Sequence, residues 1–366
     1  MNKKLFGLFV IGLLLVGLVA PVAAQDNEIA TSWTCPEGFE GQQLNIYNWS
    51  TYIAEDTIAN FQTLCGVTVT YDTFESSEAA IARLRAGNPG YDIVVPAGSD
   101  IPRLIEEELL VPLDMTKIPN FANVTPQLTG TPFDPNNEYA IGYQWGTIGI
   151  GYNVTKVSEE ITSWEQMFNY PEQAVAWLED RRAMLAGAAL MLGYDPNSED
   201  PAEIEAMADY LIEHGSNVIY IAGDDGQELL ARGEADMVVE YSGDIFQIMD
   251  ECECDDYAYI IPSEGANIWM DMMAIPTGAQ NVELAHVFLD YILDPQVGAD
   301  ISNYTAYASP NQAAIDGGLI DPELLNDPAI YPDEELLQRL YWTQANIDSE
   351  QLYNDAWDEI KIRIGQ

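Results

Sequence analysis

The sequence predicts an α/β protein with two lobes, each a parallel-rich sheet flanked by helices. Short apolar runs typical of buried strands alternate with helical patterns from Leu44 onward. A proline-rich stretch over 112–135 interrupts this alternation, which then resumes. With 366 residues, the chain is long enough for two domains of ordinary size. In proteins of this class a ligand binds between the lobes, at the C-terminal ends of the strands.

The first region alternates strands with helices. Ser76-Ser77-Glu78 is typical of a helix start, and Gly87 ends the helix that runs to Ala86. The expected strands are 44–48, 67–74 and 92–96. The expected helices are 55–64, 76–86 and a segment through residues 104 and 108.

The second region begins with a strand-like run and has the same alternating character. Gly193 ends its first long helix. The expected strands are 148–152, 218–221, 237–241 and 268–275. The expected helices are 180–192, 202–214, 244–251, 282–293 and 351–364.

The N-terminus is typical of an export signal. A basic start at Lys3-Lys4 precedes the apolar run Leu5–Ala20, and Val22-Ala23-Ala24 is a small-residue cleavage site. We expect an exported protein whose signal peptide is 1–24 and whose N-terminal extension is 25–42. The first lobe is expected to comprise 43–146 plus about 272–310. The second lobe, with the hinge, is expected to comprise 147–271 plus about 311–366.

The chain is strongly acidic, with 13 basic and 60 acidic residues and a formal net charge of −47. Such a surface repels nucleic acid and anionic membranes and concentrates cations nearby. Adaptation to salt or acid explains the overall charge at least as well as a cationic ligand does, because a ligand site needs only a few carboxylates.

Four cysteines in an oxidising compartment favour disulfides, and three pairings exist. Cys35 precedes the first strand and Cys65 ends the first helix, so a bridge between them would tie the extension to the first βα unit. Cys252 and Cys254 then close on each other or stay reduced. A zinc site is the competing hypothesis, although His214 and His286 lie far from the cysteines in sequence.

Aromatic side chains stand beside acidic or hydroxyl groups at three places where strand-like runs end or begin. Aromatic faces attract cations and carboxylates pair with them, so the three clusters together indicate a slot for an organic amine. Each cluster alone is more typical of a core or domain interface. The clusters are Trp49-Ser50-Thr51-Tyr52, Tyr241-Ser242-Gly243-Asp244 and Trp269-Met270-Asp271.

Sequence motifs for common catalysis are absent. There is no Gly-x-Ser-x-Gly, no Gly-x-Gly-x-x-Gly after a strand and no P-loop. The sequence therefore favours a protein that is not an enzyme. An exported hydrolase with two carboxylates stays open, because sixty acids allow many chance pairs.

Ordered blocks along nearly the whole mature chain resemble one family, the periplasmic spermidine/putrescine-binding proteins of polyamine ABC importers. The blocks include Tyr47-Asn48-Trp49-Ser50-Thr51-Tyr52, Tyr91-Asp92-Ile93-Val94-Val95-Pro96, Tyr143-Gln144-Trp145-Gly146, Trp269-Met270-Asp271 and Tyr307-Ala308-Ser309-Pro310-Asn311. The resemblance implies a type II, hinge-closing binding protein in the periplasm or extracytoplasmic space. It implies a monomer without cofactor or metal that delivers putrescine or spermidine to the permease subunits.

The resemblance also implies a ligand-binding set. Its aromatic members form walls around the alkyl chain, Asp271 holds an amine, Asp180 is a further acidic position and Tyr307 a late hydroxyl donor. The set is Trp49, Ser50, Tyr52, Ser99, Asp180, Tyr241, Asp244, Trp269, Asp271 and Tyr307.

Three positions depart from the spermidine-preferring pattern. Ala183 replaces a glutamate for a terminal amine, Ser99 stands where some relatives have tyrosine, and Asp244 resembles an acid of putrescine-preferring relatives. Thr343 or Gln344 occupies the place of the family's late glutamine. We therefore expect a short ligand. The alternatives are a quaternary amine such as betaine, ferric iron, and the exported hydrolase.

Overall fold

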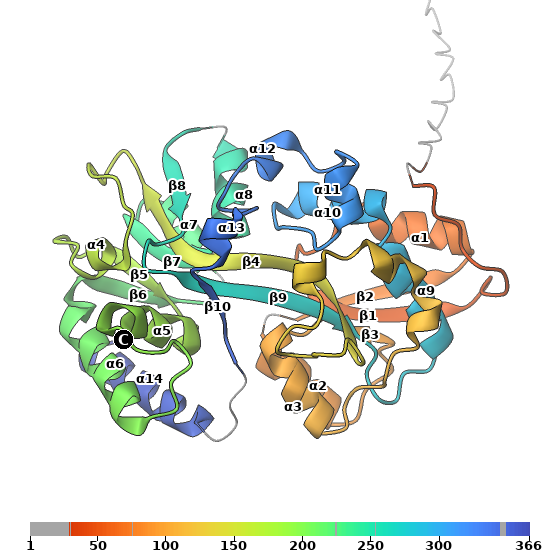
Figure 1. Cartoon of the computed structure of the whole chain (residues 1–366), viewed down its shortest axis with the longest axis horizontal. Coiled ribbons are helices and arrows are strands. Elements are labelled where there is room, and N and C mark those ends of the chain that lie inside the picture. The colour runs from red at the N-terminus through yellow and green to blue at the C-terminus, as the bar shows by residue number, and fades with distance from the viewer. Residues whose placement is uncertain (1–28, 30, 75, 224, 253, 345–348) are drawn as a thin grey trace, which may run out of the picture. The chain divides into compact units, whose positions relative to one another are not determined.

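The computed structural model describes residues 29, 31–74, 76–223, 225–252, 254–344 and 349–366 (Figure 1). Residues 31–366 form one compact unit. The predicted signal peptide, 1–24, lies outside the described residues. Within the described ranges, no helix has both the length and the apolar character needed to cross a bilayer.

The described strands form one ten-stranded sheet with two groups of parallel strands. One group consists of β2 (Thr68–Phe74), β1 (Gln43–Trp49) and β3 (Ile93–Val94). The other consists of β7 (Met237–Tyr241), β5 (Val175–Leu178) and β6 (Val218–Ala222). Two further short strands lie outside this order. β8 (Tyr257–Ile260) pairs with β4, and β10 (Leu340–Trp342) pairs with β9.

Two long antiparallel strands join the groups. β4 (Ala140–Asn153) pairs with β9 (Ala266–Ala274), and every residue of β4 is buried. The C-terminal part of β4, from Ile148 to Tyr152, also pairs antiparallel with β7. At the other end, Ala274 of β9 pairs antiparallel with Val94 of β3. Figure 1 shows the two strands running from one helix-covered group to the other. The protein is therefore a two-lobed α/β protein with a mixed sheet.

The strand expected at 148–152 is only the second half of β4. Glycines recur along β4, and glycine is depleted in strands, so sequence patterning missed its first half. The structure needs such small residues, because a Cβ at Gly149 would collide with the Ile260 carbonyl oxygen on neighbouring β8. β5 was also missed, since its four residues are too few to show a period.

Helices cover both faces of the sheet. Several begin at an aspartate whose side chain accepts backbone N–H bonds, as Asp200 does from Ala202, and α5 ends at Gly193 with φ of 72°. The helices are α1 (Thr57–Cys65), α2 (Ser77–Arg85), α3 (Ile101–Glu106), α4 (Trp164–Phe168), α5 (Arg181–Leu192), α6 (Pro201–His214), α7 (Gly226–Ala231), α8 (Ser242–Cys252), α9 (Val282–Ile292), α10 (Pro295–Thr305), α11 (Gln312–Asp316), α12 (Pro322–Leu325), α13 (Glu334–Leu337) and α14 (Glu350–Ile364). Short 3-10 turns occupy Gly98–Asp100, Met115–Lys117, Pro119–Asn123, Pro126–Leu128 and Gly215–Asn217.

Each strand group has its own hydrophobic core. Phe61 of α1 packs edge-on against Phe288 of α9 at 4.9 Å beside the first group. Trp177 of β5 and Tyr353 of α14 are fully buried in the core of the second group. The division of the chain between the lobes stays a prediction at the level of individual residues.

The predicted Cys35–Cys65 disulfide is confirmed, with the two Cα atoms 5.2 Å apart. The segment it holds is also anchored by Trp33, whose indole N–H donates to Asp290 at 2.9 Å and whose ring lies 5.0 Å from Tyr291. Cys252 and Cys254 close on each other, so no cysteine remains for zinc.

We predict that Cys35→Ser/Cys65→Ser lowers the free energy of unfolding by about 3–4 kcal/mol. The bond spans 30 residues in sequence, and cross-links that close long loops restrict the unfolded chain most. Urea unfolding measures the loss.

Cys252→Ser/Cys254→Ser is the matched control, because its bond spans only 2 residues and should contribute about 1.5 kcal/mol or less. Equal losses in the two double variants would contradict the loop-length argument.

Candidate ligand-binding site

The three aromatic clusters lie where the two strand groups meet. Trp49 is the last residue of β1, and Tyr241 is the last residue of β7, which continues directly into α8. Trp269 and Asp271 belong to β9, opposite Gly146 and Gln144 of β4. The clusters thus sit at the C-terminal ends of one strand from each group and on the antiparallel strand between them, as expected for this class of sheet.

Four predicted site residues form a continuous row of aromatic rings. Tyr52 lies 5.6 Å from Tyr307 at 78°, and Tyr307 lies 5.1 Å from Trp269 at 75°. Trp269 then meets Tyr241 at 5.7 Å and 90°. These edge-to-face contacts bring together side chains from four separate segments of the chain. We call Tyr52, Tyr307, Trp269 and Tyr241 the aromatic row.

Two glycines permit the close packing of this row, and the sequence analysis gave neither a role. A Cβ at Gly243, in the first turn of α8, would lie 2.5 Å from ring atoms of Tyr307. A Cβ at Gly146 of β4 would lie 2.8 Å from the Trp269 ring. Real Cβ atoms do not approach rings so closely, so both positions require glycine for the rings to sit where they do.

Two carboxylates face the aromatic row. The Tyr307 hydroxyl donates to Asp244 Oδ1 at 3.0 Å. Burial, followed by the negative charge of Asp271, raises the pKa of Tyr52 well above its ordinary value, and Asp244 adds a smaller effect in the same direction. Asp244 and Asp271 therefore act on the same buried hydroxyl from two different elements. Both carboxylates are half-buried.

Residues behind the row hold Tyr52 in place. The Tyr143 hydroxyl donates to the Tyr52 carbonyl, and the two rings meet edge-on at 5.4 Å. The Gln144 side chain also donates to this carbonyl and accepts from Thr305. Tyr143 and Gln144 stand in one of the sequence blocks that carry the family resemblance, but no role was expected of them. Nothing in a short motif shows that they support Tyr52, because the contact spans 91 positions.

Three further predicted residues lie at the edge of this arrangement. Trp49 packs on Phe74 at 4.5 Å, and Ser50 is exposed. Ser99 is half-buried in the 3-10 turn after β3, two residues beyond Ala97, which pairs with Asp271 of β9. Ser99 is thus close in the chain to the residue that pairs with Asp271. The described contacts of Trp49 are with core residues.

Asp180 has a structural role at the start of α5. Its side chain accepts the backbone N–H groups of Arg182 and Ala183 at 2.9 and 3.0 Å. Burial, and then the charge of Asp180, raises the pKa of Tyr341 in β10. The described contacts of Asp180 are therefore with α5 and β10 rather than with the aromatic row.

Two arginines follow Asp180 and were not singled out by the sequence analysis. The Arg182 guanidinium lies 3.8 Å over the Tyr353 ring and donates to Asn197 and to the Gln344 carbonyl. Burial lowers the pKa of Arg182. Arg181 forms an ion pair with Glu350 of α14. The first turn of α5 thus carries two arginines, and Ala183 stands where the resemblance implied a glutamate for a terminal amine.

The histidines are engaged in local packing. His286 Nε2 accepts the Asp114 N–H at 2.9 Å, and its Nδ1 lies 2.7 Å from the Val282 carbonyl. His214 stacks on Tyr210 at 4.1 Å. In the parts of the chain that the structure describes, no group of three or more His, Cys, Asp or Glu side chains could hold a metal ion.

The model of the bacterial extracellular solute-binding proteins matches residues 56–332, about three quarters of the chain. The chain belongs to this family. Its two parallel strand groups, joined by antiparallel strands, are the architecture of type II periplasmic solute-binding proteins, as the solved relatives also show.

Curated and solved relatives cover almost the whole chain. The putrescine-binding periplasmic protein SpuD of Pseudomonas aeruginosa is 35% identical over 98% of this chain and 99% of its own length. The putrescine-binding periplasmic protein PotF of Escherichia coli is 32% identical over 99% of this chain and 98% of its own length. The crystal structure of the spermidine/putrescine substrate-binding protein PotD of Streptococcus pneumoniae has a TM-score of 0.81, with 31% identity, and covers 88% of this chain and 100% of its own.

Tyr52 gives a prediction for alkaline pH. In the unfolded chain its hydroxyl ionises near pH 10, whereas the folded protein holds it neutral to a higher pH. The folded state thus binds more protons, so its stability is full below about pH 10 and falls as the pH rises beyond that value. We expect Tyr52→Phe to show a smaller fall in unfolding free energy over this range.

Urea unfolding at a series of alkaline pH values measures this effect. Tyr304→Phe is the control, because the Tyr304 side chain is 50% exposed. An identical pH dependence in both variants would rule out an ionisation of Tyr52 that is suppressed in the folded state.

Proposed function

We propose that this protein is an exported, non-enzymatic binding protein that captures a polyamine, above all putrescine, and delivers it to the permease of an ABC importer. The observation that carries the proposal is the aromatic row together with Asp244 and Asp271. It joins flat apolar surface to two separate carboxylates at the meeting point of the strand groups.

This chemistry suits a diamine. A polyamine consists of ammonium groups joined by apolar methylenes, so its binding site needs spaced carboxylates and aromatic walls. Each ammonium loses water on binding, and only an ionised partner in an enclosed site offsets that cost. Closure of the two lobes over the ligand excludes water and strengthens both kinds of contact. The names of SpuD, PotF and PotD, which specify putrescine or spermidine, support the same ligand class.

The rival functions fit these residues less well. Betaine carries its own carboxylate, which Asp244 and Asp271 would repel, and its quaternary ammonium has no N–H to donate to them. A hydrolase needs two carboxylates with separate proton-transfer roles, whereas Asp244 accepts the Tyr307 hydroxyl. Calorimetric titration with putrescine, spermidine, spermine, betaine and ferric citrate separates the ligand classes.

The first turn of α5 favours the shorter ligand. Ala183 is buried and replaces the expected glutamate, and the neighbouring Arg181 and Arg182 are cationic. A third ammonium placed beside Ala183 would lose water without gaining the carboxylate that a glutamate would supply there. Putrescine, whose two ammonium groups need only Asp244 and Asp271, avoids this cost.

We predict that Asp271→Asn weakens putrescine binding by about 2–4 kcal/mol, because it leaves a buried ammonium without its ionised partner. Trp269→Ala should cost about 1–2 kcal/mol through lost cation–π and stacking contact. Calorimetry on the parent protein should give a dissociation constant near or below about 1 μM.

Asp209→Asn is the matched control, because Asp209 is exposed on α6 and the substitution removes the same charge. If Asp271→Asn binds putrescine as tightly as Asp209→Asn does, the assignment of this carboxylate is wrong.

We also predict that Ala183→Glu shifts the ratio of putrescine to spermidine affinity toward spermidine by about tenfold, ~1.4 kcal/mol. The introduced carboxylate supplies a partner for the distant ammonium and offsets part of the charge of Arg181 and Arg182. Asp244→Asn should weaken putrescine most. Competition between the two ligands measures both ratios, and unchanged ratios in both variants would mean that selectivity is set elsewhere.

A further inference from the structure

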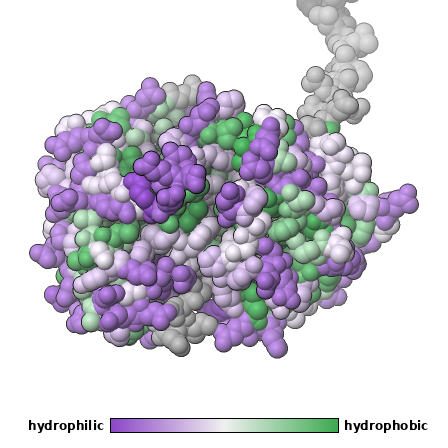
Figure 2. Space-filling model, in the orientation of Figure 1, coloured by the Kyte–Doolittle hydropathy of each residue, from purple (hydrophilic) through white to green (hydrophobic). Residues whose placement is uncertain are grey.

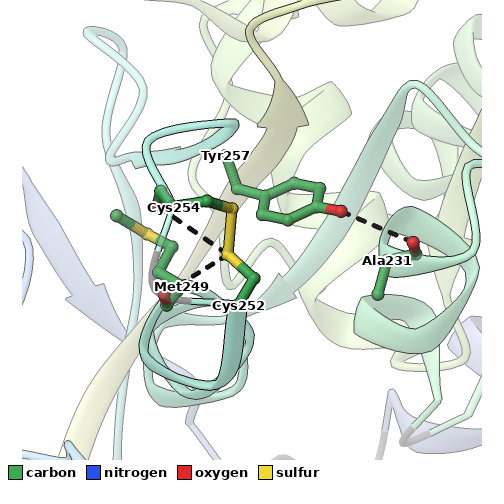
Figure 3. Close-up of a disulfide and its surroundings, with 5 residues drawn as sticks. All are labelled: Ala231, Met249, Cys252, Cys254 and Tyr257. Atoms are coloured by element: carbon green, nitrogen blue, oxygen red, sulfur yellow. Dashed lines mark hydrogen bonds between the residues drawn. A yellow bond between two sulfur atoms is a disulfide. The ribbon is translucent and has the colours of Figure 1, made fainter.

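The disulfide between Cys252 and Cys254 lies on the surface, apart from the aromatic row. Cys252 is the last residue of α8 and is exposed, and Cys254 is half-buried in the turn before β8. Figure 3 shows the two sulfur atoms at the end of the helix, with the Tyr257 ring beside them and its hydroxyl directed to the Ala231 carbonyl. An external thiol can therefore approach Cys252 without unfolding of the protein.

The two disulfides of the chain differ in what they hold together. The bond between Cys252 and Cys254 spans 2 residues, whereas that between Cys35 and Cys65 spans 30. A cross-link over so short a loop restricts the unfolded chain little, so its opening leaves the fold largely intact. Cys65 is 4% exposed and belongs to the core beside α1, where no thiol reaches it in the folded state. Cys35, the partner of Cys65, is half-buried, whereas Cys252 is exposed, so the bond between Cys252 and Cys254 is the more accessible of the two.

The surroundings of the exposed bond are acidic. Asp250, Glu251, Asp255 and Asp256 flank the cysteines and are all exposed. No lysine or arginine occurs between residues 241 and 260. Arg232, which follows α7, is paired with Glu228 at 2.8 Å and Glu234 at 3.0 Å, and Lys156, which follows β4, is paired with Asp236 at 2.9 Å. The local field attracts cations and repels anions.

We propose that the Cys252–Cys254 disulfide is a thiol-exchange site selective for cationic thiols, meaning aminothiols that carry an ammonium group. An ammonium beside the attacking sulfur is drawn to the flanking carboxylates, while an anionic thiol is kept away. This site is separate from the proposed polyamine site and does not depend on it.

The exchange follows the ordinary chemistry of disulfides. The thiolate of the aminothiol attacks Cys252 Sγ and forms a mixed disulfide, and Cys254 leaves as a thiolate that takes a proton from water. A second aminothiol attacks the mixed disulfide and releases Cys252 as a thiol. In total, two aminothiol molecules are oxidised to one disulfide, and the protein disulfide is reduced to two thiols. The Met249 carbonyl oxygen, 3.4 Å from Cys252 Sγ, is then available to accept the new S–H.

The test measures rates of exchange on the folded full-length protein with cysteamine, 2-mercaptoethanol and 2-mercaptoethanesulfonate. Each rate is corrected for the thiolate fraction and divided by the rate of the same thiol with a small neutral disulfide, which removes differences in intrinsic reactivity. We expect cysteamine to exceed 2-mercaptoethanesulfonate by about tenfold at low ionic strength, with 2-mercaptoethanol between them. In about 1 M salt the ratio should fall below about threefold.

Two variants show whether the flanking charges are responsible. Asp255→Asn/Asp256→Asn should reduce the low-salt ratio by about half, since two of the five acidic residues between positions 250 and 256 lose their charge. Glu205→Gln/Asp209→Asn changes the net charge equally on exposed positions of α6, which packs with α5 and α14, and should leave the ratio unchanged.

Peptide mapping after acid quench and alkylation identifies the bond that reacts. We expect the mixed disulfide on Cys252 and an intact bond between Cys35 and Cys65. The proposal is overturned if the folded protein does not react, if both disulfides open together, or if the ratio is the same in the parent and in Asp255→Asn/Asp256→Asn.

Discussion

β4 and β9 run antiparallel through the middle of the sheet, and the positions of both lobes and of the ligand site depend on this pairing. β4 is buried along its whole length and bonds to β9 in one half and to β7 in the other. β9 carries Trp269 and Asp271 on the same stretch that crosses between the two strand groups. A change in the relation of the lobes therefore acts directly on the residues proposed to hold the ligand.

The carboxylates of the candidate site belong to a chain that is strongly acidic as a whole. The whole chain carries −47, and hydrophilic side chains cover most of the face in Figure 2. Asp244 and Asp271 differ from the other acidic residues in being half-buried beside aromatic rings. A partly buried carboxylate has lost water, so an ammonium partner stabilises it more than it would an exposed one. Arg181 and Arg182 are paired with Glu350 and Tyr353 beside Ala183, where we propose that a further ammonium is disfavoured. In this proposal the position of a few charges, rather than their total, sets the length of ligand that the site favours.

Much of the fold could be predicted because its signals are local, and the same local signals supplied the candidate site residues. Helices such as α5, α6 and α9 begin and end within about two residues of their predicted bounds, since caps and periodic apolar positions are close in sequence. The four residues of the aromatic row were each proposed from the sequence as ligand-binding residues, partly through the family resemblance, and the structure brings their rings together. Gly243, Gly146 and Tyr143 were missed as site residues, because their contacts join segments that are distant in sequence.

The sequence by itself predicted the class of fold and the pairing of Cys35 with Cys65, which the structure confirms, because periodicity and neighbouring positions carry that information. It also supplied the proposal for the chemistry of the site, through residue type and the family resemblance. Only the tertiary structure decided that β4 extends across both strand groups, since backbone pairing overrides the low strand preference of its glycines. Only the tertiary structure brought Asp244 to Tyr307 across 63 positions and Tyr143 to Tyr52 across 91. Such contacts arise when separate elements pack together, and no local pattern encodes them.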